Sequence, residues 1–361
     1  MAEPAKDRQV LRGPACEVAD IAALPVPQEK AVLWKRLILW LVGLVGFAGG
    51  CAGGDPREAA STEPVPEPPR PVWAVRFPQG PILRPEMSPS IGANINGPSL
   101  IRVPEWIEKP LGKYYLYFAH HGGKHIRLAC ADALEGPWRI YEPGVLRLDE
   151  TAARGHVASP DVHIDPVRRQ IRMYFHGPAE GGQRTFLATS SDGLRFAAGR
   201  EVLGDFYFRV FRWGGWWYAV AKEGNLFRSR DGVTRFEPGP NPFRFDAPGL
   251  IVRHSAVRVV GDRLDVFYSR IGDAPERILL SSIPLTEDWN SWRASAPITI
   301  LKPQETYEGA DLPVAPSRSG AASGRVRQLR DPAVFEEAGR AYLLYSVAGE
   351  SGIAIAELKG V

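Results

Sequence analysis

The sequence has few cysteines and lacks the short motifs of the common nucleophile and metal enzymes. Of three cysteines in 361 residues, only Cys130 lies beyond residue 51. A domain with one cysteine cannot form an internal disulfide, so we expect Cys130 to be a small core residue. No GxSxG, HExxH or phosphate-loop motif is present. The sequence therefore gives no support to those classes of enzyme.

The chain also lacks a strong charge of either sign. Its 44 basic and 41 acidic side chains leave a net charge of +3, and no basic run is interleaved with aromatic residues. We therefore expect no nucleic-acid partner. The 37 glycines and 33 prolines, with 44% hydrophobic residues, indicate a globular chain with many turns.

The one long apolar run lies near the N-terminus. It follows Lys35 and Arg36, spans residues 37–48 and leads to small residues that end in Cys51. The run is too short to span a bilayer comfortably, which favours the h-region of a secretory signal peptide. The ending AGGC resembles a bacterial lipobox, which implies that Cys51 is lipidated. We therefore expect a lipoprotein of the bacterial cell envelope, periplasmic or outer-membrane, held to the membrane by its lipid anchor.

Two alternatives for this segment stay open, a cleaved peptide that leaves a secreted protein and a retained N-terminal anchor. Residues 1–31 are too long and too acidic for an n-region, and we hypothesise that translation begins near Val32 or Leu33. The expected organisation is a signal segment over residues 1–51, a Pro-rich linker over 52–71 that acts as a tether, and one folded domain over 72–361.

The domain is organised around a repeated unit, seen most clearly in residues 159–177. Its two segments are apolar at alternate positions, as in Ile171, Met173 and Phe175, which is the period of a strand. We count five copies of this unit. They lie at residues 96–119, 159–177, 206–222, 254–270 and 329–348.

A third strand and a hairpin ending on an aromatic residue follow each of the first four copies. These aromatic residues are Trp138, Phe196, Phe236 and Trp292. A repeat of this kind predicts an all-β fold, a single five-bladed β-propeller. A β-sandwich is the alternative, but it gives no reason to repeat one hairpin four times. To close the ring, residues 72–77 should pair with residues 352–358. We expect a monomer.

Polar residues recur where the units begin and end. In a blade, the first residue of the inner strand and the last residue of the second strand lie on the same face, near the axis. The strand starts contribute Asn96, Asp161, Arg209, His254 and Asp331, and the ends contribute His120, His121, His176, Lys222, Glu223, Arg270 and Ser346. Any one of them could be an ordinary turn cap or a solvated side chain. Together they predict a polar pocket.

Carboxylates facing one another across such a pocket, beside His and Arg, suit glycoside hydrolysis, which needs one acid and one base. The units described above resemble the five-bladed propeller glycoside hydrolases, family 43 and its relatives, over residues 96–358. The resemblance implies a carbohydrate substrate. It also implies a base Asp opening the first blade, a second Asp opening the second blade, and a Glu as proton donor.

Asp161 matches the second of these positions. For the donor, Glu223 and Glu308 are both candidates. The first blade departs from the family, because Asn96, Gly97 and Pro98 stand where the family has Asp and Pro, while Asp331 carries that dipeptide in the fifth blade. Either the carboxylates are redistributed around the ring, or the protein binds a glycan without cleaving it.

The turn that ends at Phe236 loosely resembles a sialidase Asp box, so sialidase-like chemistry is a third and less favoured interpretation. We predict no cofactor and no metal site, although His254 would be the candidate for an axial metal. The predicted catalytic residues are Asp161, Glu223 and Asp331. The predicted substrate-binding residues are Asn96, His120, His121, His176, Arg209, His254 and Arg270.

Overall fold

The computed structural model describes residues 71–243 and 249–361. The chain divides into two units, Met1–Ser61 and Thr62–Val361, and the described residues all lie in the second. The predicted signal segment, Cys51 and nearly all of the predicted linker lie outside the described residues. Among the described residues, no helix is long and apolar enough to cross a membrane.

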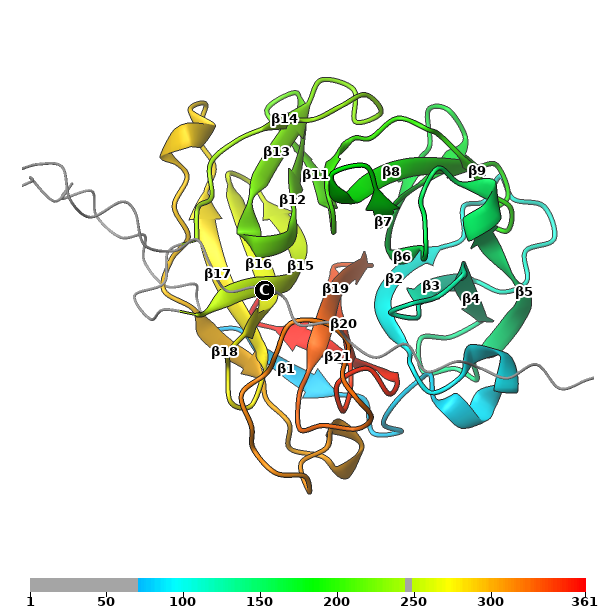
Figure 1. Ribbon diagram of the computed structural model, residues 1–361, viewed down its shortest axis with the longest axis vertical. Helices are drawn as coiled ribbons and strands as arrows, with labels where there is room; N and C mark the ends of the chain where they lie inside the picture. Colours follow the sequence, from blue (N-terminus) through cyan, green and yellow to red (C-terminus); the bar gives the residue numbers. More distant parts are fainter. Residues whose placement is uncertain (1–70, 244–248) are drawn as a thin grey trace, which may run out of the picture. The chain divides into compact units, whose positions relative to one another are not determined.

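Five antiparallel sheets surround a common axis, so the predicted five-bladed propeller is confirmed (Figure 1). Blade 1 consists of β2 (Asn96–Arg102), β3 (Tyr114–Ala119), β4 (His125–Ala131) and β5 (Arg139–Arg147). Blade 2 consists of β6 (Ala158–Asp165), β7 (Gln170–Ala179), β8 (Gly182–Ser190), β9 (Ala197–Ala198) and β10 (Gly204–Asp205). Blade 3 consists of β11 (Arg209–Trp213), β12 (Trp216–Val220), β13 (Leu226–Ser229) and β14 (Glu237–Pro238).

Blade 4 consists of β15 (Ile251–Val260), β16 (Arg263–Ile271), β17 (Ile278–Pro284) and β18 (Ile298–Leu301). Blade 5 consists of β19 (Arg330–Glu337), β20 (Arg340–Ser346), β21 (Ile353–Lys359) and β1 (Trp73–Arg76). The short 3-10 helices are η1 (Pro85–Met87), η2 (Pro89–Ile91), η3 (Leu148–Glu150), η4 (Lys222–Gly224), η5 (Trp289–Ser291) and η6 (Thr306–Glu308).

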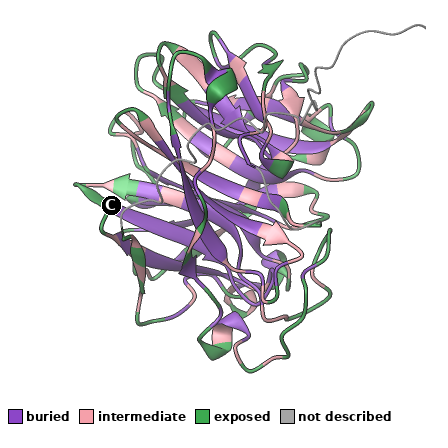
Figure 2. Cartoon of the chain, turned by 90° about the vertical axis from the view of Figure 1, so that its left-hand side faces the viewer, coloured by how far each residue is buried: buried purple, intermediate pink, exposed green. Residues whose placement is uncertain are grey.

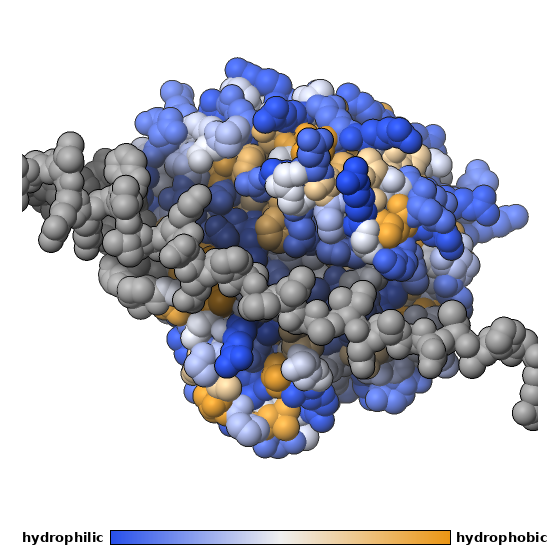
Figure 3. Space-filling view, in the orientation of Figure 1, coloured by the Kyte–Doolittle hydropathy of each residue, from blue (hydrophilic) through white to orange (hydrophobic). Residues whose placement is uncertain are grey.

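The hydrophobic core is divided among the interfaces between neighbouring blades. Because successive strand residues point to opposite faces of a sheet, Tyr115 and Tyr117 of β3 pack against blade 2, while Leu116 and Phe118 pack against blade 5. The middle strands are therefore buried on both faces (Figure 2). On the face drawn in Figure 3, the described residues that remain visible are mostly hydrophilic, with apolar groups scattered between the polar ones.

The four aromatic residues that end the hairpins fill these interfaces. Trp138, Phe196, Phe236 and Trp292 are at most 6% exposed, and each belongs to a core between two blades. The turns before two of them are held by Asp192 and Asp231, whose carboxylates accept backbone N–H groups within the turn. The turn that ends at Phe236 therefore has a structural role, because the Asp231 carboxylate holds its backbone.

The first and last strands close the ring. β1 pairs antiparallel with β21, with Trp73 opposite Lys359 and Arg76 opposite Ala356. The predicted pairing is thus confirmed. Arg76 adds a side-chain contact, because its Nε donates to Oε1 of Glu308 at 2.8 Å. The fifth blade is therefore built from both ends of the domain.

Candidate active site

The inner strands of blades 1, 2, 4 and 5 bulge near their first residues. In blades 1, 2 and 5 the bulge puts one residue with positive φ directly before a proline, namely Gly97, Ser159 and Asp331. A bulge inserts an extra residue and re-aims the side chains that follow it. The residue on the axis is therefore the bulged one, two positions before Asp161 in blade 2.

A cavity of about 160 Å³ lies on the axis at the mouth formed by these strand starts. One buried water needs roughly 10–15 Å³ on this scale, so the cavity can admit a small polar molecule. Its lining is mostly polar or ionisable. The residues are Asn96, His121, His156, Ala158, Ser159, His176, Gln183, Phe206, Tyr207, Lys222, Arg253, His254, Ser319, Gly320, Asp331 and Glu350.

Five of the ten predicted site residues line this cavity, namely Asn96, His121, His176, His254 and Asp331. Lys222, which the sequence analysis also placed at a strand end, lines the cavity as well. The other five do not line it, namely His120, Asp161, Arg209, Glu223 and Arg270. A role for any of the ten in catalysis or binding remains a prediction.

Asp161 lies between blades 2 and 3, away from the cavity. Its Oδ2 accepts the backbone N–H of Val210 and contacts Nε2 of His163, both at 2.8 Å. Burial opposes ionisation, but His163, Arg209 and the Val210 N–H together lower the pKa of Asp161. The carboxylate is therefore an ionised tie between two blades.

Neither candidate for the proton donor reaches the cavity. Glu223 is exposed in η4, with its backbone at φ 67°. Glu308 is fully buried beside the closing strand, where it accepts from Arg76 and, at 2.9 Å, from the Tyr345 hydroxyl. Its carboxylate therefore takes part in the contacts that close the ring.

The remaining three predicted residues make structural contacts. Nδ1 of His120 accepts the N–H of Gly122 at 3.0 Å. Arg209 is buried under the cavity, where its Nε donates to the Ser255 carbonyl at 3.0 Å. Arg270 donates to Asp273 at 2.8 Å. Arg209 supports the cavity from below, while the other two stabilise loops around it.

Asp331 is the most unusual group of the cavity. It is 2% exposed, and Oδ1 accepts the Tyr207 hydroxyl at 2.9 Å. Nδ1 of His254 lies 3.0 Å from the same oxygen without the geometry of a hydrogen bond, and Oδ2 has no partner among the described residues. Burial and the neighbouring Glu350 raise the pKa of Asp331 to about 6, against the opposing effects of Tyr207 and Arg330.

Tyr207 supports this carboxyl group from blade 3. Its backbone has φ 69°, which is an outlier for a bulky side chain and is found mostly at functional sites. The ring stacks on His254 with centroids 4.5 Å apart, and the Arg209 guanidinium lies 4.5 Å from the ring centroid. Burial and Asp331 keep the pKa of Tyr207 well above its usual value, so the hydroxyl remains a donor.

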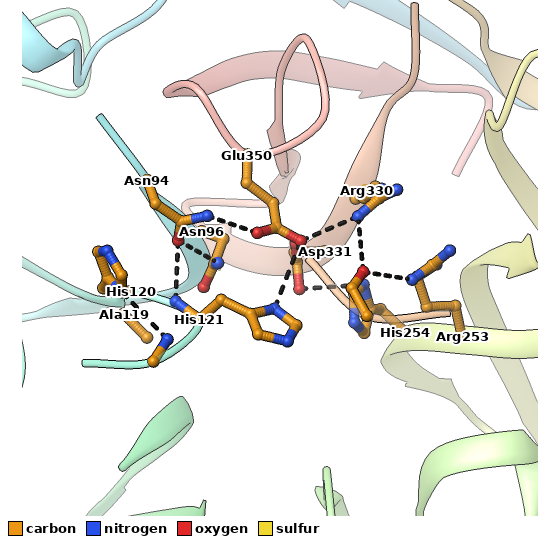
Figure 4. A network of polar contacts seen from close by, with 12 residues as sticks. Asn94, Asn96, Ala119, His120, His121, Arg253, His254, Arg330, Asp331 and Glu350 are labelled. Carbon is orange, nitrogen blue, oxygen red and sulfur yellow. Dashed lines mark hydrogen bonds and ion pairs between the residues drawn. The ribbon is translucent and has the colours of Figure 1, made fainter. Parts of the chain in front are cut away.

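Glu350, from the turn between β20 and β21, is the second carboxylate of the cavity (Figure 4). It accepts from Asn94 at 2.6 Å and from Arg330 at 2.9 Å, and it lies 3.6 Å from Nδ1 of His121. Although burial opposes ionisation, His121 and Arg330 lower the pKa of Glu350 to about 2. The cavity thus holds one carboxylate that is ionised and one that titrates near pH 6.

Arg330 links Glu350 to a second buried carboxylate. Its Nε lies 3.2 Å from Glu276, which also pairs with Nε of Arg253 at 2.9 Å. All four side chains are almost fully buried. This alternating chain of charges holds one side of the cavity rigid.

Three of the histidines in the cavity are neutral at pH 7. Burial, together with nearby positive groups, lowers the pKa of His156 and holds those of His176 and His254 well below the usual value. His121 is the exception, because its contact with Glu350 raises its pKa. Within residues 71–243 and 249–361, no group of three His, Cys, Asp or Glu side chains could hold a metal ion.

Sequence reasoning missed Tyr207, Glu350, His156, Gln183 and Arg253. Arg253 lies in the bulge of β15, directly before His254, so the bulge explains its omission. Tyr207 precedes β11, which has no bulge, by two residues. Glu350 lies in a turn between strands, and no repeat marks it.

Comparisons with known proteins place the chain beside a viral protein. No protein-family model matches the sequence. The chain is 37% identical over 322 residues to "Uncharacterized protein R118" of Acanthamoeba polyphaga mimivirus, and the match covers 80% of this chain and 90% of the viral protein. The chain belongs to the R118 family.

For this R118 family member, solved structures show the same fold at low sequence identity. A thermostable family-43 glycoside hydrolase matches with a TM-score of 0.52 and 14% identity, over 73% of this chain and 88% of that one. A GH43_1 enzyme from Xanthomonas citri matches with a TM-score of 0.54 and 12% identity, over 79% and 91%. A structure titled "Glycoside hydrolase" gives 0.57 and 15%, over 78% and 92%. The resemblance to these propellers is confirmed for the fold.

The predicted location is wrong. A bacterial cell envelope was inferred from the lipobox-like ending at Cys51, but the relative at 37% identity is a protein of a giant virus. That finding points to a viral, non-bacterial origin. The four letters AGGC were too short a pattern to carry the inference.

Proposed function

We propose that the axial cavity binds a carbohydrate and cleaves its glycosidic bond, with Asp331 as the general acid. The observation that carries the proposal is the state of Asp331, a buried carboxyl group with a pKa of about 6 and one oxygen without a partner in the described chain. A carboxyl group with a raised pKa beside one that stays ionised is the arrangement that divides acid and charge-stabilising roles in glycosidases.

The residues divide the chemistry as follows. Protonated Asp331 donates its proton to the glycosidic oxygen as the bond to the anomeric carbon breaks. Ionised Glu350 stabilises the positive charge that develops on the sugar ring. A water molecule then adds to the anomeric carbon and gives its proton to the Asp331 carboxylate, which restores the acid for the next turnover. Asn96, His121 and His254 surround this point with hydrogen-bonding groups.

The fold supports a carbohydrate substrate, since it is the fold of the family-43 glycoside hydrolases. The test is turnover of aryl glycosides and of plant and algal polysaccharides by the full chain. We expect the Asp331→Asn variant to lose about 10²-fold to 10⁴-fold in kcat, the usual contribution of a general acid. Asp149→Asn is the control, because Asp149 lies on the surface in an ion pair with Arg147.

An Asp161→Asn variant separates this assignment from the one based on sequence. A small effect of that variant on kcat, beside a large effect of Asp331→Asn, would support the axial assignment. Turnover that survives in Asp331→Asn, with folding intact, would overturn it.

Glycan binding without turnover is the second candidate, and blade 1 favours it. Gly97 occupies the bulge position that Asp331 holds in blade 5, and a Cβ atom there would lie 3.2 Å from Cα of Ser159. Blade 1 therefore presents no carboxylate at this position, and a side chain there would require Ser159 to shift by a few tenths of an ångström. Retained glycan binding with no turnover on any substrate would establish this alternative.

A further inference from the structure

The two sides of the axial cavity carry different charges. Both carboxylates, Asp331 and Glu350, belong to blade 5. In a ring of five blades, blades 2 and 3 lie across the axis from blade 5 (Figure 1). Those two blades contribute Lys222 and neutral hydrogen-bonding side chains. A ligand that fits both sides would carry its own negative group on the side of blades 2 and 3.

Lys222 is the cation of this second side. Its Nζ lies 5.0 Å from the centroid of the Phe206 ring, which also lines the cavity. It forms no ion pair with a carboxylate of the described residues, and the adjacent Glu223 is exposed and outside the cavity lining. Burial and the charge of Arg253 lower the pKa of Lys222. The charges of Glu223 and Glu276 oppose this effect without forming an ion pair with Lys222 among the described residues.

His176 provides an independent sign that a ligand is needed here. The side chain is 6% exposed and lines the cavity, and its Nδ1 has no hydrogen-bond partner among the described residues. Buried polar atoms are normally paired. The nearby groups are basic, since His156, Arg209 and Lys222 all act on His176. An oxygen of a ligand would satisfy this nitrogen.

We propose that the cavity takes a hexuronic acid residue, whose carboxylate binds Lys222 and His176 while its anomeric centre faces Asp331. This inference rests on the proposed function and names its substrate class. One cation without a carboxylate partner matches one singly charged carboxylate. Replacing the hydroxymethyl group of a hexose by a carboxylate hardly changes its size, which suits a cavity of about 160 Å³.

The test measures binding of monosaccharides to the full chain by calorimetry. The probes are glucuronate and galacturonate, the neutral sugars glucose and galactose, and glucose 6-sulfate. A charge-assisted hydrogen bond should make the uronates bind about tenfold to hundredfold more tightly than their neutral counterparts. We expect Lys222→Gln to abolish that preference.

Lys113→Gln is the matched control, because Nζ of Lys113 lies 5.1 Å from the centroid of the Tyr114 ring and outside the cavity. Equal binding of acidic and neutral sugars would overturn the inference, as would tighter binding of the sulfate than of the uronates, or a preference that survives in Lys222→Gln.

The same experiment separates this inference from the proposed hydrolysis. Uronates that bind through Lys222 while no glycoside is cleaved would support the acidic-sugar site and overturn the hydrolase. Cleavage of neutral aryl glycosides, with aryl uronides left intact, would support the hydrolase and overturn the acidic-sugar site.

Discussion

The Tyr207 hydroxyl donates a 2.9 Å hydrogen bond to Oδ1 of Asp331 and so joins blade 3 to blade 5 beneath the cavity. This contact occupies one carboxylate oxygen, while Oδ2 has no partner among the described residues. It also stabilises the ionised form of Asp331, which opposes the effect of burial on the pKa. Tyr207 therefore acts on any reaction through Asp331, as a positioning residue.

The variant Tyr207→Phe should raise the pKa of Asp331 further, because it removes a donor to the ionised form. A general acid loses activity as the pH rises through its pKa, so the basic limb of the kcat/KM profile should move to higher pH. Tyr117→Phe is the control, since it removes a buried hydroxyl that donates to the Gly193 carbonyl outside the cavity. An unchanged basic limb in Tyr207→Phe would contradict this role.

Asp331 should make stability depend on pH in the direction opposite to that of most carboxylates. Its folded pKa of about 6 lies above the unfolded value of 3.8. The stabilising contribution is therefore fully present below about pH 4 and is lost as the pH rises through 6. At pH 8, Asp331→Asn should be more stable than the wild type by on the order of 2–3 kcal/mol, with the difference shrinking toward pH 4.

Urea unfolding between pH 4 and 8 measures this effect. Asp161→Asn should show the opposite pH dependence of unfolding free energy. The folded pKa of Asp161 is lowered, so its stabilising contribution is lost as the pH falls. A constant difference between Asp331→Asn and the wild type across this range would contradict the raised pKa.

Arg330 should be important for stability, because it lies between two buried carboxylates. The variant Arg330→Met leaves Glu276 and Glu350 without this partner. Breaking a buried ion pair in this way costs about 3–5 kcal/mol. Arg340→Met is the comparison, since Arg340 is exposed and pairs with Glu357. An exposed pair contributes about 0–1 kcal/mol. Equal losses of unfolding free energy in the two variants would refute the assignment.

Gly97 should resist substitution by any side chain. Its φ of 59° is unfavourable for other residues, and an added Cβ would also lie 3.2 Å from the Ser159 backbone. Gly97→Ala should cost roughly 1–2 kcal/mol for the backbone conformation, plus the steric term. Gly339→Ala isolates the backbone term, because Gly339 has φ 73° and open space around it. Thermal unfolding of both variants should show the larger loss for Gly97→Ala.

The sequence predicted the architecture well because the architecture follows from repetition. The aromatic residues that end the hairpins mark the cores between blades, and residues 73–76 close the ring as expected. Each of these features depends on local pattern and on the number of strands. Neither requires knowledge of how a single side chain is oriented.

The site was predicted only in part because its details depend on one-residue shifts. The bulge in β6 puts Ser159 on the axis and turns Asp161 toward blade 3. In blade 3, where β11 does not bulge, the residue that contacts Asp331 is Tyr207, two positions before the strand start at Arg209. A bulge moves a side chain to the other face of the strand, and the repeat pattern does not reveal it.

The pairing of β1 with β21 also sets the order in which the domain can mature. Trp73 and Lys359 lie near opposite ends of the domain in sequence, so their contact carries the loop-closure cost of almost the whole propeller. Contacts of such long range slow folding. Both carboxylates of the cavity belong to the blade that this contact completes. A nascent chain can therefore assemble four blades during synthesis, but it acquires its acidic wall only after its final strand has been made.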